Sequence, residues 1–179
     1  MDYIFETARL GIRKFTLADA EALLKNHAEE DVRKWIPNES YADLEEARSA
    51  INFYMDRVNA RTLPYVLAVE LKETGELIGD TGVNIIEGSE SDAEIGYVIC
   101  RKHHNKGYAT ELVRAMSAFV FSTFHIGVLF GRVMQGNNAS VKVLEKNGYF
   151  FVGEEFGAAD DPYGKGMLLY KLAANSITK

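Results

Sequence analysis

The residues from Glu94 to Glu111 have the types and spacing of a phosphate-binding segment. Apolar residues first alternate as in a strand, a polar turn containing Gly107 follows, and apolar positions at helical spacing continue to Phe124. The first N–H groups of a helix have no partner within it, and the helix dipole adds partial positive charge there. The segment therefore predicts an anion site, with an ordinary strand-to-helix connection as the alternative.

Two familiar phosphate-binding motifs do not occur in this sequence. A Walker loop ends a glycine-rich run with Gly-Lys-Ser or Gly-Lys-Thr, and no such run is present. A dinucleotide-binding fingerprint places three glycines in the pattern G-x-G-x-x-G, and this turn retains Gly107 alone. We therefore expect a different class of phosphorylated ligand.

The stretch His104–Ala109 resembles the acetyl-CoA signature of the GNAT N-acetyltransferase superfamily. That signature has Gln or Arg, two residues, Gly, one residue, and then Gly or Ala. The tail Gly107–Thr110 matches closely, whereas His104 replaces Gln or Arg and Asn105 stands where many members carry Gly. Asn tolerates a positive φ better than most residues, so Asn105 remains compatible with the turn.

Further stretches resemble the Rim-type branch of this superfamily, whose founding members acetylate the N-termini of ribosomal proteins. The opening Phe5–Arg13 is similar, with Ala8 where the branch often has Glu, and Trp35-Ile36-Pro37 fits the same branch. Residues Asn137–Tyr149 resemble its second motif. The resemblance extends over nearly the whole chain, from about residue 5 to residue 171.

The pattern of apolar residues predicts an α+β fold. Strands and helices are mixed without strict alternation, which favours a mostly antiparallel sheet, and the resemblance implies the mixed GNAT sheet, splayed in the middle with flanking helices. No linker or repeat is apparent, so we expect one domain over residues 1–179. The expected strands are 9–15, 65–71, 77–87, 94–100, 128–134, 150–155 and 167–172, and the expected helices are 16–30, 43–61, 110–124 and 138–147.

Composition narrows the classes of function. The net charge of −6 argues against broad nucleic-acid binding and permits a cationic substrate. No apolar run approaches the ~18 residues of a membrane span, and no secretion signal is apparent. The lone Cys100 rules out an internal disulfide and fits a reducing cytoplasm. The adjacent His103 and His104 would point apart, so we expect no bound metal. We also expect the protein to be a monomer or a homodimer and to lie in the cytoplasm.

Acetyl transfer to an amine requires a held thioester, a neutral amine, a donor for the oxyanion and a partner for the leaving sulfur. The resemblance implies that the strand ending at Ile99 pairs with the pantetheine arm of acetyl-CoA and that residues 106–110 cradle its pyrophosphate. The residues expected to bind acetyl-CoA are Val98, Ile99, Cys100, His104, Asn105, Lys106, Gly107, Tyr108, Ala109, Thr110, Asn137 and Ser140. Lys106 could instead be a solvated charge.

Two residues are candidates for catalysis. Glu94 lies on the strand that faces the acetyl group in the family, where a carboxylate could take the proton of the amine, and its alternatives are an ion pair or binding of the substrate cation. Many GNAT enzymes carry a Tyr as the acid at the position of Leu144. The Rim-type branch lacks it, and Ser140 maps to the serine suggested there as partner of the CoA sulfur. Ser140 could instead be a helix-start residue, and Tyr149 is interpreted as a core residue.

The acceptor is not encoded in a readable motif. Trp35 and Tyr54 belong to the region that lines the acceptor side in the family, although core packing explains them equally well. We expect an acetyl-CoA-dependent N-acetyltransferase whose acceptor is a peptide N-terminus or a small amine. The alternatives are a catalytically idle acyl-CoA-binding domain and a phosphoprotein- or nucleotide-binding module. The segments 35–54, 87–92 and 157–166 are expected to select the acceptor.

Overall fold

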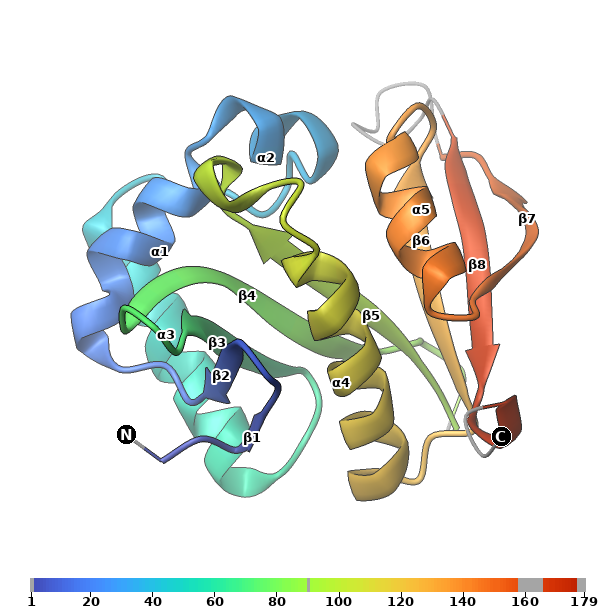
Figure 1. Ribbon diagram of the computed structural model, residues 1–179, viewed down its shortest axis with the longest axis horizontal. Helices are drawn as coiled ribbons and strands as arrows, with labels where there is room; N and C mark the ends of the chain where they lie inside the picture. The colour runs from blue at the N-terminus through green and yellow to red at the C-terminus, as the bar shows by residue number, and fades with distance from the viewer. Residues whose placement is uncertain (1, 90, 158–165, 177–179) are drawn as a thin grey trace.

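The computed structural model describes residues 2–89, 91–157 and 166–176. Within them, eight strands form one sheet in the order β1-β2-β3-β4-β5-β6-β8-β7, shown in Figure 1. β5 and β6 pair in parallel, and the other neighbouring strands pair antiparallel, which confirms the expected α+β sheet. The strands are β1 Phe5–Glu6, β2 Leu10–Arg13, β3 Tyr65–Leu71, β4 Glu76–Ile85, β5 Asp92–Ile99, β6 Val128–Met134, β7 Phe150–Glu155 and β8 Met167–Ala173. The helices are α1 Ala20–His27, α2 Glu30–Trp35, α3 Leu44–Ala60, α4 Tyr108–Thr123 and α5 Asn138–Lys146.

The sheet is splayed between β5 and β6. These strands pair over Asp92–Glu94 and Val128–Phe130, and beyond that point they diverge (Figure 1). The Cys100 N–H donates to Ile78 O on the β4 side at 2.8 Å, and Ser91 O accepts from Gly127 N on the β6 side at 2.7 Å. Because the direction of backbone groups alternates along a strand, Ile95, Tyr97 and Ile99 turn their N–H and C=O groups toward the splay.

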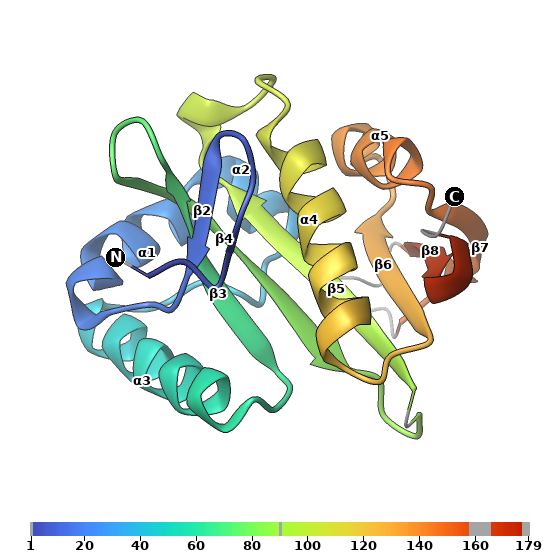
Figure 2. The ribbon, with the colours of Figure 1, turned by 60° about the horizontal axis from the view of Figure 1, so that its bottom comes forward.

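Helices cover both faces of the sheet, as Figures 1 and 2 show from two directions. On one face, α4 packs Val113, Met116 and Val120 against Ala93 and Ile95 of β5, and α5 adds Leu144 to the same core. On the other face, Leu23 of α1 and Ile51 of α3 pack against Ala68 of β3 and Leu77 of β4. Side chains of β5 therefore point alternately toward α4 and toward the face that carries α1 and α3.

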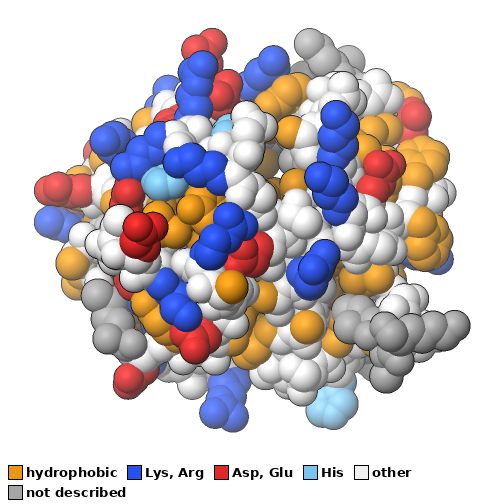
Figure 3. All heavy atoms as spheres, in the orientation of Figure 1, with side chains coloured by type: hydrophobic (Ala, Val, Ile, Leu, Met, Phe, Trp, Pro, Cys, Tyr) orange, Lys and Arg blue, Asp and Glu red, His pale blue; other side chains and the backbone are white. Residues whose placement is uncertain are grey.

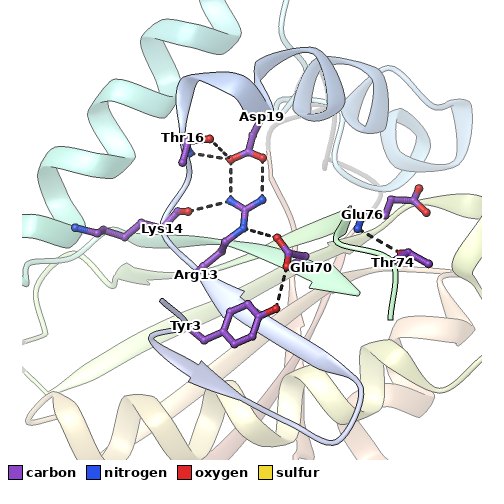
Figure 4. Close-up of polar contacts among 8 residues, drawn as sticks. All are labelled: Tyr3, Arg13, Lys14, Thr16, Asp19, Glu70, Thr74 and Glu76. Atoms are coloured by element: carbon purple, nitrogen blue, oxygen red, sulfur yellow. Dashed lines mark hydrogen bonds and ion pairs between the residues drawn. The ribbon is translucent and has the colours of Figure 1, made fainter. Parts of the chain in front are cut away.

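A buried ionic network fixes the N-terminal part of the sheet (Figure 4). Arg13 of β2 donates from both Nη atoms to Asp19 at 2.8 and 2.9 Å, and from Nε to Glu70 of β3 at 2.7 Å. The other Glu70 oxygen accepts from Tyr3 at 2.9 Å. Burial raises the pKa of Asp19, but the hydrogen bonds from Arg13 and Thr16 outweigh it and lower that pKa below its usual value. Each buried charge thus has a partner, as the interior requires.

The structure refines the expected elements at three places. The predicted helix 16–30 is a turn at Leu17–Asp19 followed by α1, and α2 begins separately after Glu29, whose backbone is extended (φ −60°, ψ 137°). The short β1 and α2 were not expected, and β5 begins at Asp92, two residues before the expected strand 94–100. Glu90 and most of segment 157–166 lie outside the described residues. In the described part of the chain, every helix is too short or too polar to cross a bilayer.

Candidate active site

The splay between β5 and β6 opens into a cleft of about 1250 Å³. Its walls come from α2, β5, β6, α5 and the turn before α4, and they include Trp35, Glu39, Glu94, Tyr97, Arg132 and Ser140. Trp35 reaches across from α2, since a Cβ built on Gly136 after β6 would lie 3.8 Å from its ring. One cleft thus joins the predicted phosphate turn to the predicted catalytic residues.

The turn before α4 has the backbone of an anion site. Asn105 (φ 59°) and Gly107 (φ 82°) both adopt left-handed conformations, as the tolerance of Asn for positive φ allows. α4 begins at Tyr108, and the Glu111 N–H makes the first helical hydrogen bond to Gly107 O at 3.1 Å. The N–H groups of the residues between them have no helical acceptor and remain available for a ligand.

Arg9 holds this turn in place from the opposite end of the sequence. Its Nη1 donates to Lys106 O at 2.9 Å, and its guanidinium lies 4.4 Å from the centre of the Tyr108 ring. Arg9 also pairs with Glu111 of α4, with Nη2 2.6 Å from Oε2. The sequence indicated Arg9 as part of a family motif but gave no signal that it contacts the turn.

The two adjacent histidines contact different partners. His104 Nε2 lies 2.7 Å from Ile99 O, so its ring turns back onto the end of β5. His103 is buried, with Nε2 3.3 Å from Glu76 Oε2 and its ring against Tyr108. His104 therefore links the turn to the strand that lines the cleft, and the two rings do not converge on one point.

The face carrying α4 and α5 is rich in cations. Figure 3 shows Lys and Arg side chains gathered on this side of the molecule. Lys142 and Lys146 line the cleft, and Arg114 lines a second hollow on α4 that shares Gly107 and Thr110 with it. Positive side chains around the turn favour a polyanionic ligand there.

Glu94 points to the face of β5 opposite α4, and its carboxylate is paired with Arg132. Arg132 of β6 donates from Nη1 to Glu94 Oε2 at 3.1 Å and from Nε to Glu155 of β7 at 3.0 Å. Burial in the cleft raises the pKa of Glu94, Arg132 opposes this rise, and Glu155 adds to it. The ion pair expected as an alternative for Glu94 is therefore present, yet the carboxylate still lines the cleft and remains 27% exposed.

A second carboxylate reaches the same side of the cleft. Glu39 lies between α2 and α3, and its backbone carbonyl accepts from His27 Nδ1. His27 Nε2 lies 2.8 Å from Asp80 of β4, so the buried imidazole joins the loop to the sheet. Burial would lower the pKa of His27, but Asp80 and the Glu39 carbonyl raise it to about 9. Loss of solvent around the Glu39 carboxyl raises its pKa, Asp80 and Glu94 add to that rise, and His27 opposes it.

Ser140 lies near the start of α5, on the cleft wall. Its backbone N–H donates to the Asn137 side chain at 3.2 Å, so Asn137 caps the helix. Leu144 is packed against Gly131 in the core, where a Cβ on Gly131 would lie 2.8 Å from its side chain. Tyr149 is buried, as expected of a core residue, and its hydroxyl lies 2.8 Å from Ser117 Oγ.

The structure brings most of the predicted site residues to this cleft, but not all. Tyr54 does not line the cleft and packs instead against the core under α1 and α3, with its hydroxyl 3.0 Å from that of Tyr41. Cys100 is buried in the core, and burial raises the pKa of its thiol. Lys106 contributes its backbone carbonyl to Arg9, and its side chain is exposed. The sequence did not single out Arg132 or Glu39.

Residues 9–149 match the model of the protein family described as the acetyltransferase (GNAT) domain. The chain belongs to the GNAT N-acetyltransferase family. A relative described as an uncharacterized N-acetyltransferase, p20 from Bacillus licheniformis, is 31% identical over 138 residues, which are 77% of each protein. The crystal structure of a GNAT acetyltransferase from Bacillus anthracis aligns with a TM-score of 0.80 at 28% identity, covering 95% of this chain and 98% of that one.

A ribosomal-protein GNAT enzyme shares the fold at lower identity. RimL in complex with coenzyme A aligns with a TM-score of 0.80 at 17% identity, covering 96% of this chain and 98% of that one. At this identity the likeness concerns the fold. The GNAT sheet expected from the sequence is thus confirmed.

The residues of this GNAT chain suit coenzyme A. The free N–H groups at the start of α4 can donate hydrogen bonds to a pyrophosphate, and Lys142 and Lys146 supply positive charge nearby. Tyr97 and Ile99 turn backbone groups into the splay, where an amide-containing arm can pair with them as an added strand. The Val98 N–H faces β4 instead, whereas the Ile99 N–H faces the splay, where it can donate to an oxyanion.

Proposed function

We propose that this protein transfers the acetyl group of acetyl-CoA to a primary amine by direct attack within a ternary complex. The observation that carries the proposal is the continuity of the cleft, which runs from the turn before α4, along the unpaired edge of β5, to Glu94. Phosphate, pantetheine and amine can therefore bind in line. We also place the protein in the cytoplasm, without nucleic-acid, membrane or metal partners.

The first contribution of the protein to the reaction is to position acetyl-CoA beside the amine. The turn at residues 105–107 and α4 hold the phosphate end, and β5 fixes the arm, so the thioester is delivered to the divergence of β5 and β6. Holding two reactants in register removes much of the entropic barrier to a bimolecular reaction. His104 supports this geometry by fixing the turn to the end of β5, and Arg9 supports it by fixing the turn to the loop before β2.

Glu94 is proposed as the base. An amine must lose a proton to attack, and an N-terminal amine with a pKa near ~8 has a sizeable neutral fraction at neutral pH. Glu94 and Glu39 present two carboxylates on the acceptor side, which attract a protonated amine before the proton is removed. Arg132 leaves one Glu94 oxygen free of its hydrogen bond, and that oxygen can accept the proton.

The Ile99 N–H and the Ser140 hydroxyl are proposed to act on the thioester. The first donates to the carbonyl oxygen as negative charge develops there. The second donates to the sulfur as the carbon–sulfur bond breaks. The acceptor is proposed to be a peptide N-terminus or a small amine, consistent with the net charge of −6.

The first test is release of free CoA from acetyl-CoA across N-terminal peptides, polyamines, amino acids and aminoglycosides, with an acetyl-CoA titration alongside. We expect tight binding and turnover with one class of amine. Binding without turnover for any amine would contradict the transferase and support an idle acyl-CoA-binding domain. A preference for ATP or NAD over acetyl-CoA would contradict the cofactor assignment.

A further inference from the structure

Tyr97 carries an unusual hydroxyl group. The residue lies on β5 and lines the cleft, but its oxygen is buried and has no hydrogen-bond partner among the described residues. Buried polar groups in folded proteins are nearly always paired, so a hydroxyl left without a partner calls for an explanation. Phenylalanine would pack the same ring without this penalty.

Tyr149 shows what a purely structural tyrosine looks like in the same core. Its ring is buried in the cluster that Tyr97 packs against, and its hydroxyl is satisfied by Ser117 Oγ at 2.8 Å. Ser117 in turn donates to Val113 O at 2.7 Å. The core can therefore satisfy a tyrosine hydroxyl, and the hydroxyl of Tyr97 differs by facing α5 and the cleft.

The group that faces the Tyr97 hydroxyl is Ser140. Burial raises the pKa of Tyr97 to about 12, and the neighbouring Ser140 hydroxyl opposes that rise. Both residues line the same cleft, and the Tyr97 hydroxyl has no hydrogen-bond partner among the described residues. At neutral pH Tyr97 keeps its proton and can act toward Ser140 as a donor.

The Ser140 side chain is free to respond. Asn137 already satisfies the Ser140 backbone N–H at 3.2 Å, and the serine hydroxyl makes no hydrogen bond of its own among the residues described. A hydroxyl has one proton to donate and rotates to suit its neighbours. If Tyr97 donates its proton to a lone pair of Ser140 Oγ, the single proton of Ser140 must point away from Tyr97 and toward the cleft.

We propose that Tyr97 is a positioning residue for Ser140: the Tyr97 O–H donates to Ser140 Oγ and directs the Ser140 proton at the sulfur of CoA. The inference rests on the proposed function. When the carbon–sulfur bond breaks, its electron pair goes to sulfur, which accepts a hydrogen bond from Ser140. Ser140 and Tyr97 keep their protons, and the proton of the amine leaves through Glu94 to solvent. Two linked hydroxyls strengthen each other as donors.

The test compares calorimetric affinities for CoA and for desulfo-CoA, which lacks the sulfur. We expect the native protein to prefer CoA by about fivefold, the value of one net hydrogen bond. Tyr97→Phe and Ser140→Ala should each abolish this preference, and the double variant should show no further loss. Tyr149→Phe is the matched control, and it should lower the melting temperature while keeping the preference.

Kinetics provide the second readout. Tyr97→Phe should lower kcat several-fold with little change in the KM for acetyl-CoA, and should have no further effect in the Ser140→Ala background. A native preference for CoA over desulfo-CoA in Tyr97→Phe, or effects that multiply in the double variant, would overturn the proposal. Failure of the native protein to acetylate any amine would instead refute the proposed function, because the binding comparison does not depend on turnover.

Discussion

Glu94 and Arg132 lie on the two strands that diverge at the centre of the sheet, and Arg132 Nη1 donates to Glu94 Oε2 at 3.1 Å. The pair forms at the point where β5 and β6 cease to pair, so it stands at the base of the cleft. Arg132 also holds Glu155, which leaves the cation shared between two carboxylates. The arrangement keeps Glu94 oriented while its pKa stays above the ordinary value.

Glu94→Gln should lower kcat by about 100-fold or more near neutral pH, because the amide cannot take a proton. The Kd for acetyl-CoA should not change, since the turn and the edge of β5 are untouched. Steady-state kinetics with the acceptor found active, together with a binding titration, check both expectations. Glu154→Gln is the matched control, because Glu154 lies on the exposed strand β7 and does not line the cleft. Its carboxylate accepts from Gln135 Nε2 at 3.0 Å. An unchanged kcat in Glu94→Gln would remove Glu94 from the role of base.

The pH dependence of kcat/KM should report the environment of Glu94. The base must be ionised, so activity should fall as the pH drops through the pKa of Glu94, which burial raises above 4.5. Arg132→Gln removes the cation that lowers this pKa, so the acid limb should move to higher pH. Glu155→Gln removes a repulsive carboxylate and should move the limb to lower pH. If the acid limb of the pH profile lies at the same pH in the native protein and in both variants, a group other than Glu94 titrates.

Gly107→Ala should weaken acetyl-CoA binding by about tenfold, because a left-handed conformation costs a residue with a Cβ about 1–2 kcal/mol. The φ of Gly107 is 82°, and the strain would distort the turn that we propose receives the phosphates. Gly75 in the β3–β4 turn has φ 70° and open space around it, so Gly75→Ala is the control. It should lose stability without losing affinity. Equal affinity losses in the two variants would contradict a special role for the turn.

Loss of the His27 proton should lower the free energy of unfolding at alkaline pH. Its pKa is raised from 6.5 to about 9 in the fold, so its contribution is complete below about pH 6.5 and is lost as the pH rises through 9. A shift of this size corresponds to about 3 kcal/mol at most. Urea unfolding at pH 6.5 and pH 9.5 should show this loss in the native protein and a much smaller one in His27→Gln. Parallel losses in both would assign the effect to other groups.

The sequence by itself determined most of the elements and the strand, turn and helix around Asn105 and Gly107. The bounds of strands Tyr65–Leu71, Val128–Met134 and Phe150–Glu155 agree with the predicted ranges, because short runs rich in apolar, aromatic and β-branched residues are a local property of the chain. The turn was also readable, because a glycine and an asparagine at positive φ before a helix leave a local signature at Asn105 and Gly107. Helix α2 was missed because six residues carry too little periodicity.

The tertiary structure alone decided which side chains meet at the site. Arg9 and Lys106 are 97 positions apart, Glu94 and Arg132 are 38 apart, and His27 and Asp80 are 53 apart. These contacts follow from strand order and from the splay, which depend on the packing of all the elements together. No local pattern reports that β5 lies beside β6, and therefore none could reveal that Glu94 has a cation or that Tyr97 faces Ser140.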